Sequence, residues 1–235
     1  MTRFVELSNL ERYKEKINSH IGELEKDLDF GSNSNILGMF SVKNYTGSGI
    51  TKSGNVQIDE NGIASNFINK TDYVITNLNT LDLQLPYEFQ IKFKVSDKSA
   101  FDELHLISNK TYAFPCFELV IAKDKIILES FKSQSYDAYV LFYDSFNFVE
   151  NKWYIINMKH QQEGIYECSV YDEQYNELYN KTQKSNYEIN YHSDTIILGN
   201  DVDYVTGSAT LQIDLSETYF KHDDTIISDW NKWQL

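Results

Sequence analysis

Two acidic side chains near the end of the sequence have a spacing that could support hydrolysis of a glycosidic bond. Asp214 and Glu217 lie in or just after residues 211–215, where apolar and polar residues alternate as in a strand. A retaining glycosidase needs two carboxyl groups beside one cleft, one as nucleophile and one as acid. In a Glu-x-Asp-x-x-Glu arrangement the nucleophile position here holds Gln212, and an amide cannot form the covalent intermediate. Packing explains the segment better, so we expect the chain not to be an enzyme, with glycoside hydrolase as a minor alternative.

A stretch at residues 131–149 combines many aromatic rings with polar groups. Sugars are bound by stacking on rings and by hydrogen bonds to carboxylates and amides, so this mixture favours a glycan-binding surface. The candidate glycan-binding residues are Tyr136, Asp137, Tyr139, Tyr143 and Asn147. The alternative is that Val140 and Phe142 fill the core while the tyrosines lie at the rim or at an oligomer interface.

Another polar group follows the apolar run at residues 196–198. Asn200, Asp201 and Asp203 could supply oxygen ligands to calcium. Two acidic residues in a loop more commonly form a solvated turn, and nothing else in the sequence completes a calcium-binding loop. Calcium is the one cofactor that we consider, and no other is expected.

The composition excludes one broad class of partner. The 235 residues include 21 Lys and Arg against 35 Asp and Glu, a net charge of −14. Binding to DNA or RNA needs clustered basic side chains, so a nucleic-acid partner is not expected. The sequence has no secretory signal pattern and no run of about 18 apolar residues, so we expect a soluble chain without membrane insertion. Cys116 and Cys168 fit neither a disulfide framework nor a zinc site.

Residues 7–28 carry the one sustained helical pattern, with apolar residues at two heptad positions. These candidate oligomerisation residues are Leu7, Leu10, Ile17, Ile21, Leu24 and Leu28. A helix of this length could form a short coiled coil or pack on its own domain, and both remain open. A polar linker at residues 31–36 then separates an N-terminal segment, residues 1–30, from a domain at residues 37–235.

The domain at residues 37–235 has the pattern of an all-β protein. In residues 88–95 apolar side chains alternate with Glu, Gln and Lys, which predicts a strand with one buried face. Two hairpins are expected, at residues 117–129 and 153–171. About a dozen short strands with antiparallel connections predict a mainly β fold, a two-sheet antiparallel jelly-roll sandwich.

Five short motifs follow one another along this β domain. They are NGIASNF at 61–67, DYV at 72–74, YEFQIKFKV at 87–95, NKWY at 151–154 and ILGN at 197–200. In this order they resemble the concanavalin A-like lectin and laminin-G superfamily, over residues 37–225. The resemblance implies a concanavalin A-like sandwich, a fold that serves in lectins, glycosidases and structural modules. Laminin-G-like domains often hold calcium at the sandwich rim, which is the second reason to consider that ion.

The two ends of the chain extend the resemblance. The opening FVELSNLERY at 4–13 and the closing strand LQIDLSETYF at 211–220, followed by Trp230 and Trp233, are similar to those of tailed-bacteriophage fibre and receptor-binding proteins. This implies a virion structural protein, assembled in the host cytoplasm. It would be a homotrimer that contacts other virion proteins through its N-terminal helix and presents the sandwich to a host surface polysaccharide. The alternative is a decoration or scaffold protein whose sandwich only packs on other virion subunits.

Overall fold

The computed structural model describes residues 36–39, 50–69, 71–82, 86–108, 117–131, 138–187, 192–200 and 210–222. All of them belong to the unit that spans residues 35–235. The predicted helix at residues 7–28, with its six apolar heptad residues, lies outside the described residues. The described part contains no α-helix, and none of its helical turns could cross a membrane.

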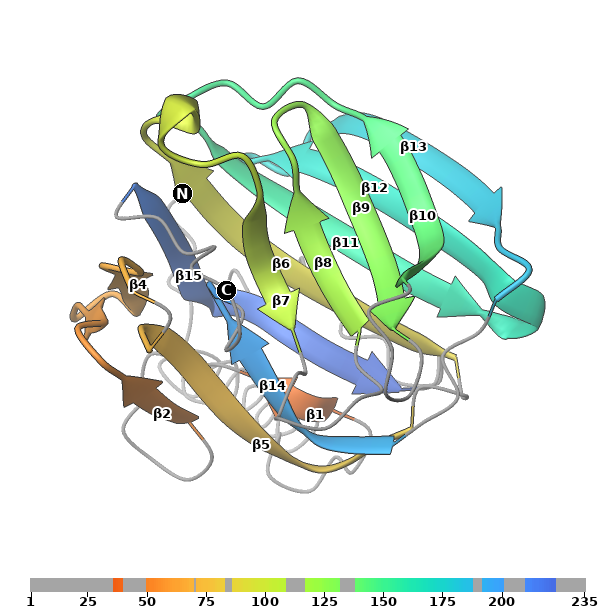
Figure 1. Ribbon diagram of the computed structural model, residues 1–235, viewed down its shortest axis with the longest axis horizontal. Helices are drawn as coiled ribbons and strands as arrows, with labels where there is room; N and C mark the ends of the chain where they lie inside the picture. Colours follow the sequence, from red (N-terminus) through yellow and green to blue (C-terminus); the bar gives the residue numbers. More distant parts are fainter. Residues whose placement is uncertain are drawn as a thin grey trace, which may run out of the picture. The chain divides into compact units, whose positions relative to one another are not determined.

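Two antiparallel sheets make up the described part, as predicted for a two-sheet sandwich (Figure 1). One sheet has eight strands, in the order β13-β12-β11-β6-β15-β4-β3, with β1 also paired to β15. Its members are β1 (Ile36–Met39), β3 (Gln57–Ile58), β4 (Ile63–Ser65), β6 (Tyr87–Val95), β11 (Trp153–Gln161), β12 (Ile165–Asp172), β13 (Glu177–Lys184) and β15 (Leu211–His222).

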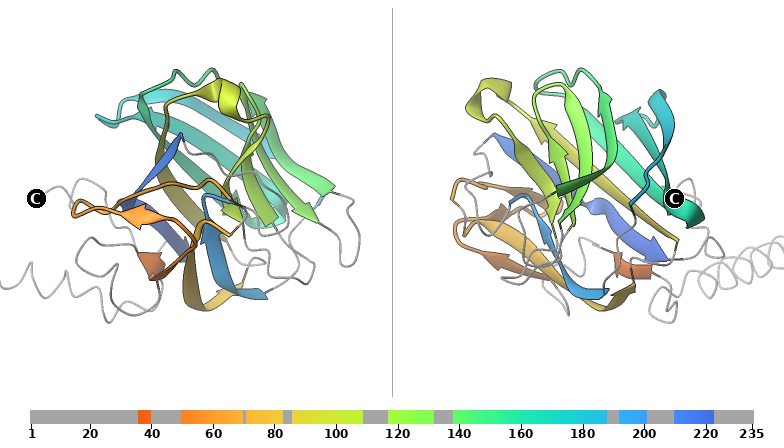
Figure 2. Two further views of the ribbon diagram at one scale, coloured as in Figure 1. Left: turned by 60° about the vertical axis from the view of Figure 1, so that its left-hand side comes forward. Right: turned by 45° about the vertical axis from the view of Figure 1, so that its right-hand side comes forward.

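The second sheet has seven strands, in the order β10-β9-β8-β7-β14-β5-β2. Its members are β2 (Ile50–Ser53), β5 (Tyr73–Asp82), β7 (Leu104–Ser108), β8 (Phe117–Ile121), β9 (Lys125–Phe131), β10 (Ala138–Ser145) and β14 (His192–Leu198). Strands β7 to β10 stack against β6, β11 and β12 of the first sheet (Figures 1 and 2). Both expected hairpins are confirmed, as β8–β9 and β11–β12.

Alternation along β6 fills the space between the sheets. Phe89, Ile91 and Phe93 are at most 1% exposed and belong to the hydrophobic core, as the period of two predicts. The opposite face differs from a simple solvated face, because Glu88 and Gln90 on it are also buried. Part of the outward face of this sheet is therefore buried and held by polar contacts, and is not simply exposed to solvent.

Side chains of β13 join the two sheets along one side of the sandwich. Gln183 donates from Nε2 to the carbonyl of Tyr143 on β10 at 2.7 Å, and the Tyr143 amide donates to Gln183 Oε1 at 2.9 Å. Ser185 Oγ also donates to the carbonyl of Val140 at 3.3 Å. One glutamine thus makes the pair of hydrogen bonds that a neighbouring strand would make.

Candidate functional site

Five side chains form a row across the outward face of the eight-stranded sheet. Each of the five is the register partner of the next on the neighbouring strand. In order they are Gln57 (β3), Ser65 (β4), Gln212 (β15), Lys94 (β6) and Trp153 (β11). At the usual spacing of strands the row is about 19 Å long. We call these five residues the outer row.

The outer row points away from the core because its neighbours in sequence point inward. Ala64, Ile213 and Phe93 alternate with row members and are at most 1% exposed. The row therefore places two amides, a hydroxyl, an ammonium and an indole on one surface. Polar groups that can bond to hydroxyls beside an aromatic face are the chemistry that sugars require.

An open hollow lies at the β3 end of the outer row. Its volume is about 350 Å³, within the range of small-molecule sites. It is lined by Lys52, Gln57, Ile58, Asp59, Ile63, Ser65 and Gln212. Three row members thus belong to a concave surface that is large enough to receive a small ligand.

A charged cluster lies beside the other end of the row. The Lys92 ammonium is 3.2 Å from Asp214 Oδ2 and 2.6 Å from Glu217 Oε1, and it lies 5.6 Å from the centroid of the Trp153 ring. Burial would lower the pKa of Lys92, but Glu217 and Asp214 outweigh it and raise that pKa. Lys94 also approaches the Trp153 ring, at 4.8 Å from its centroid.

Both carboxylates of this cluster are fully engaged. Asp214 accepts through Oδ1 from the amide of Ser216 at 3.0 Å and from its hydroxyl at 2.6 Å, while Oδ2 faces Lys92. Glu217 meets Lys92 through Oε1 and accepts from the Tyr175 hydroxyl through Oε2. Packing of the strand through Leu211, Ile213 and Leu215 is also observed, since all three are buried. The carboxylates themselves, however, belong to the outward polar surface.

A buried polar network lies on the same outward face of the sheet. Asn157 on β11 donates through Nδ2 to Glu88 Oε1 at 2.7 Å and to the Tyr219 hydroxyl at 3.1 Å. Gln90 donates through Nε2 to the carbonyl of Glu217 at 3.0 Å. These bonds connect β6, β11 and β15 through their side chains and the Glu217 carbonyl, which fixes the surface that carries the cluster.

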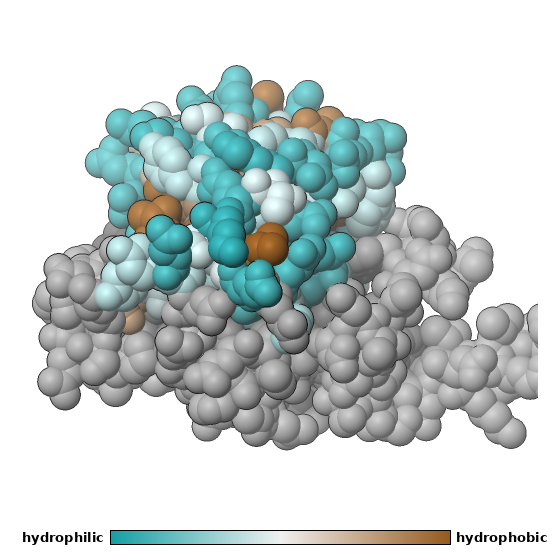
Figure 3. Space-filling view, turned by 90° about the vertical axis from the view of Figure 1, so that its right-hand side faces the viewer, coloured by the Kyte–Doolittle hydropathy of each residue, from teal (hydrophilic) through white to brown (hydrophobic). Residues whose placement is uncertain are grey.

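The predicted tyrosine surface is only partly described, because Tyr136 and Asp137 lie outside the described residues. Tyr143 is 42% exposed, with the Lys125 ammonium 5.1 Å from its ring centroid. Tyr139 stacks on Tyr187, with ring centroids 3.9 Å apart. Figure 3 views the side of the molecule that bears β10 and β13, where hydrophobic residues form small separate patches in a mainly hydrophilic surface.

Three further residues of that stretch lie in β10 or just after it. Phe142 is buried as expected, but Val140 is 48% exposed, because the pairing of β10 with β9 shifts register between these two residues. Asn147 accepts a hydrogen bond from Lys98 Nζ at 3.4 Å and thus lies near the β8–β9 turn.

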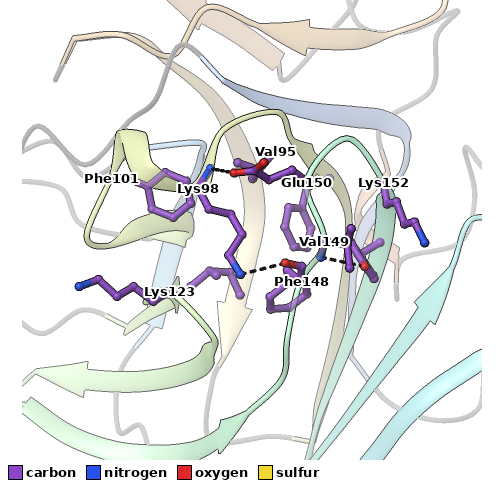
Figure 4. A pocket seen from close by; sticks show the side chains of 11 residues that line it. Val95, Lys98, Phe101, Lys123, Phe148, Val149, Glu150 and Lys152 are labelled. Atoms are coloured by element: carbon purple, nitrogen blue, oxygen red, sulfur yellow. Dashed lines mark hydrogen bonds between the residues drawn. The ribbon is translucent and has the colours of Figure 1, made fainter.

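A small apolar cavity beneath Lys98 is not a ligand site (Figure 4). Its volume is about 10 Å³, which holds at most one water molecule. Lys98 closes it by donating from Nζ to the carbonyl of Phe148 at 2.9 Å, while its amide donates to Glu150 Oε1 at 2.8 Å. These contacts stabilise the loop between β10 and β11.

Asn200, one of the three predicted calcium ligands, has a structural role. It is fully buried and donates through Nδ2 to the carbonyl of Asn69 at 2.6 Å and to that of Asp72 at 3.3 Å. Asp201 and Asp203 lie outside the described residues. Within the described ranges no group of three or more His, Cys, Asp or Glu side chains could hold a metal ion, so calcium remains a prediction.

The outward face of the seven-stranded sheet carries two facing glutamates. Glu129 on β9 is the register partner of Glu118 on β8, and Glu118 Oε2 lies 3.1 Å from His105 Nδ1. Burial and the charge of Glu118 raise the pKa of Glu129 to about 7. No pattern within either strand indicates this pair, because the pairing register brings the two glutamates together.

We expect Glu129→Gln to stabilise the protein in alkaline solution. Because folding raises this pKa from 4.5 to about 7, the folded state binds more protons in that window and loses stability as the pH rises through it. Allowing for partial exposure, the gain is about 1–2 kcal/mol at pH 8 and near zero below pH 4.5. Urea unfolding at pH 8 and at a pH below 4.5 measures the difference in unfolding free energy between the wild type and Glu129→Gln. Glu163→Gln, at an exposed position, is the control. Equal pH slopes for the wild type and Glu129→Gln would contradict the prediction.

Comparisons with known proteins identify the fold. No protein-family model matches the chain, and no curated protein does. Among solved structures, the receptor-binding domain of botulinum neurotoxin D is 14% identical, with a TM-score of 0.59 over 84% of this chain and 51% of that chain. The serotype D ligand-binding domain in complex with N-acetylneuraminic acid is 16% identical, with a TM-score of 0.56 over 84% of this chain and 49% of that one.

A third similar structure is the binding domain of botulinum neurotoxin DC in complex with rat synaptotagmin II. It is 15% identical, with a TM-score of 0.57 over 82% of this chain and 49% of that one. These proteins share the fold. The chain spans about half the length of each of them, so the likeness assigns no ligand to it.

Proposed function

We propose that this chain is a bacteriophage virion structural protein, in a tail or head fibre or spike, whose lectin-like sandwich adheres to a host surface glycan. The observation that carries the adhesion role is the outer row, which sets amides, a hydroxyl and an indole in line with a hollow of about 350 Å³. The similar solved structures are receptor-binding domains, and one of them is in complex with a sugar, N-acetylneuraminic acid. The proposed partners are a host polysaccharide, other virion proteins at the N-terminal helix and two further copies of the chain.

We propose binding without hydrolysis. All four oxygens of Asp214 and Glu217 already accept hydrogen bonds or face Lys92, and the nucleophile position holds Gln212. A glycosidase needs one carboxyl group that can approach the anomeric carbon and one that can donate a proton. The occupied carboxylates favour a role in orienting hydroxyl groups.

Trp153→Ala is expected to weaken glycan binding by about tenfold or more, because Trp153 supplies the aromatic ring of the outer row and aromatic side chains commonly dominate binding energies. A glycan array probed with the full chain identifies the glycan, and calorimetry then compares the wild type, Trp153→Ala and Gln212→Ala. The matched control is Tyr143→Ala, which removes an exposed ring at the β10 edge. Loss of binding in Tyr143→Ala alone would show that the glycan binds at the tyrosines and not at the outer row. A blank array for the wild type would contradict the adhesion role.

One observation favours the scaffold alternative, in which the sandwich packs only on other virion subunits. Val140 and Leu178 are each 48% exposed and Tyr187 is 47% exposed, all on or next to the adjacent strands β10 and β13. Exposed apolar and aromatic side chains are also what the centre of a protein interface contains. A blank array together with burial of these three side chains in the assembled particle is the result expected of a scaffold.

A further inference from the structure

The turn between β12 and β13 reaches over the outward face of the eight-stranded sheet. The hydroxyl of Tyr175 in this turn donates to Glu217 Oε2 on β15. Strands β11 and β6 lie between β12 and β15, so the contact bridges about 14 Å of sheet. The turn is thus folded over the sheet and does not simply extend its edge.

Tyr175 holds this position in a conformation that its residue type disfavours. Its φ is +62°, in the left-handed region where glycine or asparagine is usual. Asp172 fixes the turn by accepting from the amides of Gln174 and Asn176, each at 2.9 Å, and the Tyr175 amide donates to the Asp172 carbonyl at 3.1 Å. Glycine or asparagine would suit this backbone conformation better, whereas tyrosine adds the hydrogen bond to Glu217.

Two intermediate side chains, Glu217 and Lys92, connect Tyr175 to the Trp153 end of the outer row. Glu217 bonds both to Tyr175 and to Lys92, and the Lys92 ammonium lies beside Trp153, the last member of the row. Ile155 points outward between these strands and is nevertheless fully buried, so the face is covered here. At the opposite end, the hollow beside Gln57 is open.

We propose that Tyr175 closes the outer row at Trp153, so that the row accepts the non-reducing end of a glycan chain and excludes chain-internal sugars. The inference rests on the proposed function and adds the class of ligand. A surface polysaccharide is attached through its reducing end, and its free end can enter from the hollow and stop at the tyrosine. A row that was open at both ends would let the chain pass along the sheet and bind at any point.

Paired glycans on an array test this directly. Each pair is attached through its reducing end, and the second member carries one additional sugar on the non-reducing end. The wild type is expected to bind the extended member at least about tenfold more weakly. In Tyr175→Gly, which suits the positive φ and preserves the fold, the two members are expected to bind within about twofold of each other.

Two further variants make the outcomes distinct. Tyr175→Phe keeps the ring and removes the hydroxyl that bonds to Glu217, so it should retain much of the discrimination. Equal binding of both members by the wild type, or unchanged discrimination in Tyr175→Gly, overturns the closure by Tyr175 while leaving the adhesion role intact. Trp153→Ala is expected to bind both members of a pair more weakly than the wild type does, since that variant removes the ring of the row. Absence of binding by the wild type overturns both proposals.

Discussion

Replacing Asp72 by alanine is expected to lower the free energy of unfolding by about 3 kcal/mol. Asp72 is fully buried, and its carboxylate accepts from the amides of Asn55 at 2.8 Å, Ile68 at 3.2 Å and Asn69 at 2.8 Å. The side-chain amides of Asn55 and Asn69 add bonds at 3.4 and 3.1 Å. Alanine would leave three backbone donors without their partner, and unsatisfied buried groups cost more than the bonds themselves contribute.

Acid should reduce the difference in unfolding free energy between the wild type and Asp72→Ala. Burial alone would raise the pKa of Asp72, but the hydrogen bonds from Asn55 and Asn69 outweigh it and hold the pKa below 3.8. The stabilisation is present above that value and is lost as the pH falls through the lower pKa of the folded state. Denaturant unfolding at pH 7 and pH 3 measures it. The control is Asp59→Ala, which removes bonds to the amides of Asn61 and Ile63 at an exposed site. It should lower the free energy of unfolding by less than about 1 kcal/mol. An equal loss of stability at positions 59 and 72 would refute the prediction.

Gly199→Ala is expected to cost about 3 kcal/mol or more, because it combines strain with a steric clash. Gly199 has a φ of +84°, and a Cβ atom there would lie 2.3 Å from the ring of Phe67, which is fully buried. The amide of Gly199 also donates to the carbonyl of Leu106 at 3.0 Å, so the backbone cannot easily move away.

A double-mutant cycle separates the two causes. Phe67→Leu creates room near position 199, so Gly199→Ala should cost less in that background than in the wild type. The remaining cost then measures the backbone strain alone. Strictly additive free energies of unfolding for the two substitutions would show that the ring is not the obstacle.

Local alternation was enough to predict the sandwich and its inward residues. The period of two in residues 88–95 correctly placed Phe89, Ile91 and Phe93 in the core, because one side of a strand must be buried in such a fold. It did not show that Glu88 and Gln90 on the other face would be buried by bonds from distant strands. A pattern within one strand contains no information about its neighbours across the sheet.

The candidate site was missed for the same reason. Gln57 and Trp153 are far apart in sequence, and only the order and register of five strands bring them into one row. The alternation around Asp214 predicts packing through Leu211, Ile213 and Leu215, which is confirmed, but it does not show that Asp214 pairs with Lys92 of another strand. A tryptophan at an outward position of the 153–160 strand was the one available signal, since such a ring on a polar face needs an explanation.

The glutamine that bonds to the backbone of β10 also limits how copies of this protein can associate. Its amide already occupies the Tyr143 carbonyl and N–H to which an incoming extended segment would have to bond. A strand from another molecule therefore cannot lengthen the sheet there without first displacing Gln183. Many copies can be concentrated in a small volume without fibril-like growth from this border, which is a requirement for any protein displayed in a dense array.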